Sequence, residues 1–140
     1  MPLFFVMKKT AKVKSPSRQE LAELIQSIGG KTVLFSVLKD FYETMQKDIL
    51  IGFFFNGHDL LHISEMQGKF LLMAAGLNSS YEGKGPSTAH TSLPPILSGH
   101  FDRRLIILKE TLRKHSLTAK QVETWLRFEE SFRAVVVARS

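Results

Sequence analysis

Two polar side chains interrupt apolar helical stripes, and they are the first candidates for chemistry. Tyr42 follows Phe41 in one stripe, and Gln67 precedes Phe70 in another. A buried phenol or amide without a hydrogen-bond partner costs about 1–3 kcal/mol. Each side chain therefore needs an internal partner, which is the commoner arrangement for a buried tyrosine, or a ligand that accepts its hydrogen bond.

The histidines offer one candidate metal ligand. His90 lies in a short turn between a loop rich in Asn, Ser and Gly and the pair Pro94-Pro95. An isolated histidine is more often a surface residue than a ligand, but neutral imidazole binds iron, and one histidine is enough to hold a haem. His58 and His62 have i, i+4 spacing without a third ligand, so we expect no structural zinc site.

Composition excludes several functional classes. The chain has 140 residues, which predicts one domain, and it has no cysteine. Disulfides, thiolate metal sites, thioether-attached haem and cysteine nucleophiles are therefore excluded. The sequence also contains no G-x-S-x-G, P-loop or G-x-G-x-x-G motif. It thus gives no indication of a hydrolase or a nucleotide-binding enzyme.

The net charge of +6 is concentrated near the N-terminus. Five basic residues precede the first acidic residue, and the rest of the chain carries only about +1. A basic tail on a near-neutral domain is typical of a solvated extension, so we expect no nucleic-acid partner. The apolar N-terminus precedes its lysines, unlike a signal peptide, and no segment approaches the ~20 apolar residues of a membrane span. We therefore predict a cytoplasmic protein without a membrane partner.

All strong periodicity in the chain is helical, which predicts an all-α domain over 17–140 behind a tail of residues 1–16. Ser17 and Glu20 form a capping box that starts the first helix, and Gly29-Gly30 ends it. The other predicted helices cover about 32–46, 60–77, 99–114 and 118–136. The apolar run 49–55 is either a strand or a corner. Residues 77–88 form a loop.

The later helices each have a predicted inward stripe. In the helix from residue 60 the stripe is Ile63, Met66, Gln67, Phe70, Leu71 and Ala74. In the last two helices the stripes are Phe101, Leu105, Leu108 and Leu112, and Trp125, Phe128, Phe132 and Val136.

These features together resemble the group I truncated haemoglobins over about residues 21–137. The order and spacing of several short segments carry the resemblance. The segments are Gly29-Gly30, Asp40-Phe41-Tyr42, Phe54-Phe55 followed by Gly57, Gln67 with Phe70, Tyr81 with Gly83, Ala89-His90, and His100-Phe101-Asp102.

The resemblance implies a shortened globin, in which two antiparallel helix pairs cross over a non-covalently held haem b. It implies that His90 is the proximal iron ligand and that Phe55 packs against the porphyrin. Tyr42 and Gln67 would be the distal donors. The pocket lining would comprise Ile63, Met66, Phe70 and Leu71.

The expected function is reversible binding of O₂, and of NO and CO, at the iron. Bound O₂ takes on partial negative charge, so a phenol O–H and an amide N–H each stabilise it by about 1–3 kcal/mol. As an enzyme, such a protein would oxidise NO to nitrate, and a separate reductase would restore ferrous iron. We expect a monomer or a weak dimer.

Three features depart from the family pattern, and two other functions stay open. The chain has Gly76-Leu77-Asn78 where the family often has Gly-Gly, one extra residue between His90 and His100, and Arg104 where an apolar haem contact is often found. The first alternative is a gas or redox sensor that signals to a partner protein through the tail. The second is a globin-like interaction module without haem.

Overall fold

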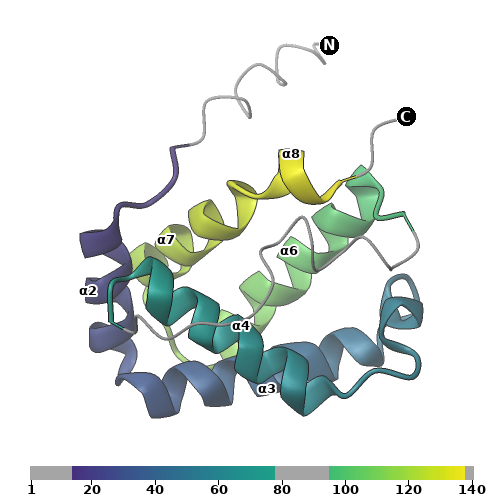
Figure 1. The fold of residues 1–140 in the computed structure, drawn as a ribbon, viewed down its shortest axis with the longest axis horizontal. Coiled ribbons are helices and arrows are strands. Elements are labelled where there is room, and N and C mark those ends of the chain that lie inside the picture. Colours follow the sequence, from purple (N-terminus) through teal and green to yellow (C-terminus); the bar gives the residue numbers. More distant parts are fainter. Residues whose placement is uncertain (1–13, 78–94, 138–140) are drawn as a thin grey trace.

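The computed structural model describes residues 14–77 and 95–137 (Figure 1). The described residues form six α-helices and one 3₁₀ helix and contain no strand, which confirms the all-α prediction. The elements are α2 (Arg18–Ile28), α3 (Lys31–Gln46), η1 (Gly52–Phe55), α4 (Leu60–Ala74), α6 (Ser98–Lys114), α7 (Ala119–Glu130) and α8 (Arg133–Val136). Outside this range lie residues 1–13 of the predicted tail, residues 138–140 and the segment that contains Tyr81, Gly83, Ala89 and His90.

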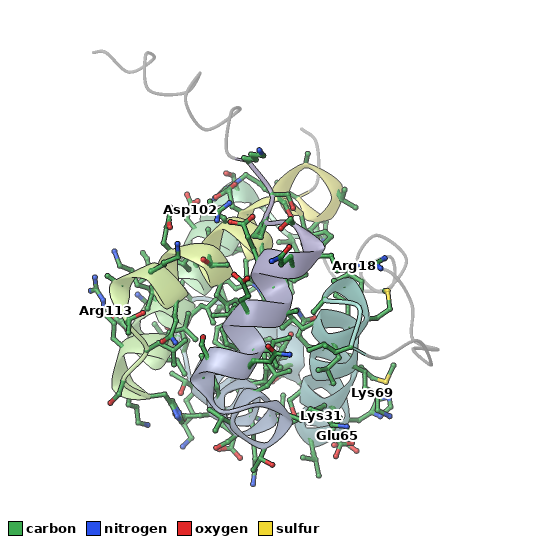
Figure 2. The ribbon with its side chains drawn as sticks, turned by 90° about the vertical axis from the view of Figure 1, so that its left-hand side faces the viewer. Arg18, Lys31, Glu65, Lys69, Asp102 and Arg113 are labelled. Atoms are coloured by element: carbon green, nitrogen blue, oxygen red, sulfur yellow. The ribbon has the colours of Figure 1, made fainter. Side chains whose placement is uncertain are left out.

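The helices form two antiparallel pairs. In Figure 1, α4 runs back along α3, and α7 runs back along α6. Contact between α3 and α6 joins the pairs, while α2 packs against α3, α4 and α7. Figure 2 shows α2 in front, with α4 on one side of it and α7 on the other, and places the labelled side chains Glu65, Lys69 and Arg113 on the outside.

Side chains that cap the backbone set the helix starts. The Ser17 hydroxyl accepts from Glu20 N at 3.0 Å, and the Glu20 carboxylate accepts from Ser17 N at 2.8 Å, so the predicted box is present. Asp59 caps α4 by accepting from His62 N at 3.2 Å. These contacts satisfy backbone N–H groups that have no partner in the first turn of a helix.

The run 49–55 is a corner that contains η1, not a strand. Asp48 holds this corner through one carboxylate. Its Oδ1 accepts from Leu50 N at 2.9 Å and from Ile51 N at 3.3 Å, while its Oδ2 accepts from Arg103 Nη2 at 2.7 Å. Because Arg103 belongs to α6, this ion pair fixes the corner that carries Phe55 against the second helix pair.

The predicted inward stripe of α4 is wrong in part. Only Leu71 of that stripe is fully buried. The face packed on α3 includes Gly68, which has no side chain because an added Cβ would overlap the ring of Phe35. The residues of this buried face are Ser64, Gly68, Leu71, Leu72 and Ala75. The remainder of the predicted stripe is half-buried beside it, so α4 has two neighbouring apolar faces.

The last two stripes also differ from the prediction. In α6, Ile107 and Thr111 are fully buried, whereas Leu105 is half-buried. The final helix is interrupted between α7 and α8, where the Ser131 hydroxyl donates to the Phe128 carbonyl at 2.6 Å. Such hydroxyl bonds give the backbone a local alternative to helix continuation.

None of the described helices is long and apolar enough to span a membrane alone. The pair α2 and α3 passes together by length and composition, with a bend of 89° at the break.

The Gly68 contact predicts a steric cost at the interface of α3 and α4. We expect Gly68→Leu to lower the free energy of unfolding by about 1–3 kcal/mol, because the added side chain must displace the Phe35 ring. Thermal or urea unfolding measures this change. The matched control is Gly99→Ala, because a Cβ at Gly99 meets nothing within 4 Å. Equal stabilities of Gly68→Leu and wild type would contradict the packing described here.

Candidate functional site

Tyr42 lies inside the fold, on α3, with only 6 % of its surface exposed. Its ring meets the half-buried ring of Phe55 edge-on, with the centroids 5.8 Å apart. Burial raises the pKa of Tyr42; Arg104 opposes this shift, and Glu129 adds to it. The phenol therefore keeps its proton at neutral pH and is available as a hydrogen-bond donor.

Gln67 faces the same region from α4. Its side chain is half-buried, and its Nε2 donates to Glu129 Oε2 at 3.4 Å. A primary amide carries two N–H donors, so this bond occupies one and leaves the other for a second acceptor.

A buried ion pair between Arg104 and Glu129 lies beside both predicted donors. Arg104 Nη2 is 2.9 Å from Glu129 Oε1, and the two side chains are 21 % and 5 % exposed. The guanidinium carbon lies 4.9 Å from the Phe41 ring centroid and 5.7 Å from that of Tyr42, within cation–π range. Burial acts to lower the pKa of Arg104. The neighbouring Tyr42 and Glu129 outweigh this effect and raise that pKa above its usual value. Arg104 is therefore a permanent cation at the site.

Glu129 is not among the residues predicted from the sequence, although a signal for it was present. Glu129 comes four residues after Trp125 and three before Phe132, so it lies on the inward stripe of α7. Arg104 likewise lies on the stripe of α6, three residues after Phe101. A charge within an apolar stripe is the same signal that singled out Tyr42 and Gln67.

The predicted lining residues take two different positions. Ile63, Met66 and Phe70 are half-buried on the face of α4 that carries Gln67. Phe70 also packs near Phe132, at 5.6 Å between centroids. Leu71 is fully buried in the main core, on the neighbouring face of the helix.

The distal residues fit a haem. A flat apolar macrocycle needs an incompletely covered apolar surface, and the half-buried side chains of α4 together with Phe55 provide one. Tyr42 and Gln67 add donors at that surface for a polar ligand. His90 lies outside the described residues, and the described ranges contain no group of three or more His, Asp or Glu that could hold a metal ion.

The ion pair predicts an asymmetric effect on stability. We expect Glu129→Gln to lower the free energy of unfolding by about 2–4 kcal/mol, because Arg104 would stay charged and largely buried without its carboxylate. Combining it with Arg104→Met should recover most of this loss, which urea unfolding would measure. Glu123→Gln is the control on the same helix, because Glu123 is exposed. A double variant no more stable than Glu129→Gln would contradict the argument.

Comparison with known proteins gives a consistent family assignment. The model of the bacterial-like globin family matches residues 23–137. The group 1 truncated hemoglobin of Chlamydomonas moewusii is 28 % identical over 110 residues, which are 78 % of this chain. The match spans 64 % of that relative's length.

Solved structures agree on the fold. The truncated hemoglobin of Tetrahymena pyriformis in its Fe(III) form superimposes with a TM-score of 0.75 at 24 % identity, over 83 % of this chain and 98 % of that one. The 2/2 hemoglobin of Synechococcus sp. PCC 7002 gives 0.69 at 20 % identity, over 80 % and 94 %. The chain thus belongs to the bacterial-like globin family and has the truncated, 2/2 haemoglobin fold.

Proposed function

We propose that this globin holds haem b through His90 and reversibly binds O₂, and also NO and CO, on the side of Tyr42 and Gln67. One observation carries the proposal. The two donors come from different helices, yet both lie at the same ion pair beside a half-buried apolar face. Gln67 donates to Glu129, and the Tyr42 ring lies 5.7 Å from the guanidinium carbon of Arg104. Buried polar groups placed together in this way are typical of a site that orients a small polar ligand.

The residues of this chain have separable tasks in the proposed site. The haem, when bound, supplies an iron that coordinates a diatomic gas. The Tyr42 O–H and the free Gln67 N–H donate to the gas, while Ile63, Met66 and Phe70 exclude water. Hydrogen bonds favour O₂ over CO, because coordinated O₂ carries more negative charge.

Oxidation of NO to nitrate is the enzymatic form of the same proposal. It requires O₂ and NO to meet beside Tyr42 and Gln67, and it requires an external electron-donating reductase. A sensor that signals to a partner protein remains an alternative use of the site.

The haem proposal predicts a spectroscopic effect of the histidine. We expect the wild-type protein to take up one haem per chain and to give a strong Soret band. His90→Ala should lose this band or show a changed ligation of the ferrous iron. Visible absorption before and after reduction measures both. His62→Ala is the control, since His62 is exposed on α4. If the wild-type protein takes up no stoichiometric haem, the proposal is wrong, and a haem-free helical interaction module becomes the better description.

The distal donors predict faster O₂ release when they are removed. We expect Tyr42→Phe and Gln67→Leu each to raise the O₂ dissociation rate by about 5- to 150-fold, which corresponds to a hydrogen bond of about 1–3 kcal/mol. Stopped-flow displacement of O₂ measures the rate. CO dissociation should change less. Glu43→Gln, at an exposed position of the same helix, should leave both rates unchanged. Equal O₂ rates in wild type and both donor variants would argue against these roles.

A further inference from the structure

The Glu129 carboxylate contacts both Gln67 and Arg104 at the proposed gas site. Glu129 accepts from Gln67 through Oε2 at 3.4 Å and from Arg104 through Oε1 at 2.9 Å. The guanidinium carbon of Arg104 in turn lies 5.7 Å from the centroid of the Tyr42 ring. A chain of contacts therefore runs from Gln67 of α4 through Glu129 of α7 and Arg104 of α6 to Tyr42 of α3.

The chemistry of these groups fixes which way each donor points. An ionised carboxylate only accepts, so Glu129 requires the NH₂ side of the Gln67 amide and excludes its flipped orientation. A guanidinium has no acceptor, so Arg104 cannot receive a hydrogen bond from the Tyr42 O–H beside it. The Tyr42 O–H and the second Gln67 N–H are then both left to donate to another group.

We propose that Arg104 and Glu129 are positioning residues of the gas site, which hold Tyr42 and Gln67 with their N–H and O–H groups directed toward the ligand. The proposal rests on the gas-binding function proposed above. It also assigns a specificity. A site with two oriented donors retains ligands of partial negative charge, such as O₂, more strongly than CO, which interacts only weakly with the same donors.

The cost of burying the pair supports a role beyond stability. Of the ion pairs in the described part of the chain, Arg104 with Glu129 is the most buried. Two charges removed from water repay their desolvation poorly, and apolar side chains of similar volume often stabilise a core as well or better. A buried pair that also contacts two polar neighbours is suited to fixing their orientation.

The test replaces the whole pair, so that no unpaired charge remains. The variant is Arg104→Met with Glu129→Leu, which keeps Tyr42 and Gln67. The matched control is Arg127→Met with Glu20→Gln. It removes a different ion pair of α7, at 3.0 Å, and the Gln oxygen still accepts from Ser17 N at the start of α2. Circular dichroism and urea unfolding of both proteins establish that they fold.

Three readouts distinguish positioning from a structural role. We expect the test variant to release O₂ at least 10-fold faster with CO release within 2-fold of wild type, which is a loss of O₂ stabilisation of about 1.4 kcal/mol or more. The C–O stretching band of its CO complex should broaden or split, because the donors lose their single orientation. In the haem-free protein, the side-chain NH₂ signals of Gln67, assigned with Gln67→Leu, should exchange faster with water. The control should match wild type in all three.

Failure of this proposal and failure of the proposed function give different results. If wild type binds haem and O₂ but the test variant retains wild-type O₂ release and a single C–O band, the positioning role is overturned and gas binding stands. If wild type takes up no haem, gas binding fails. Unchanged NH₂ exchange in the haem-free test variant would then overturn the positioning contact as well.

Discussion

A guanidinium inside an apolar core must meet a carboxylate, and this requirement links the four helices that form the site. Arg104 comes from α6 and Glu129 from α7, and their contact places charge between the two helix pairs. Phe41 and Tyr42 of α3 provide aromatic faces for the guanidinium, and Gln67 of α4 donates to the carboxylate. Neither charge is stable there alone, so the position of each helix depends on the others.

Helix α4 has two neighbouring faces with different packing, and this allows a short chain to form such a surface. One face carries small residues and packs closely on α3, where Gly68 accommodates the Phe35 ring. The adjacent face carries larger apolar residues and Gln67, and it is only half-covered. Close packing on the first face therefore leaves the second face incompletely covered. The corner before α4, fixed to α6 through Asp48 and Arg103, carries Phe55 to the edge of the same surface.

The polar groups of the site divide into donors and the pair that orients them. Tyr42 remains protonated because burial disfavours the phenolate and raises its pKa. Gln67 has one N–H committed and one free. Because a carboxylate only accepts, Glu129 fixes which side of the Gln67 amide faces it. In the proposed site, selectivity for a ligand would then depend on residues that need not touch it.

The sequence by itself determined the helices and singled out Tyr42 and Gln67 as candidate donors. Capping residues such as Ser17 with Glu20 act over three positions, so local chemistry is enough to locate a helix start. Tyr42 and Gln67 were recognisable because a polar residue in an apolar stripe is costly wherever the stripe packs. The resemblance to truncated haemoglobins added the order of these segments, and the family comparison agrees with it.

Only the tertiary structure decided which faces are buried and which charges meet. The periodicity of α4 is compatible with two adjacent faces, and the choice between them depends on the Phe35 ring of another helix. The partners Arg104 and Glu129 are 25 residues apart, and Gln67 and Glu129 are 62 apart. Pairing at such separations follows from how helices pack in space, and helical periodicity within one segment carries no information about it.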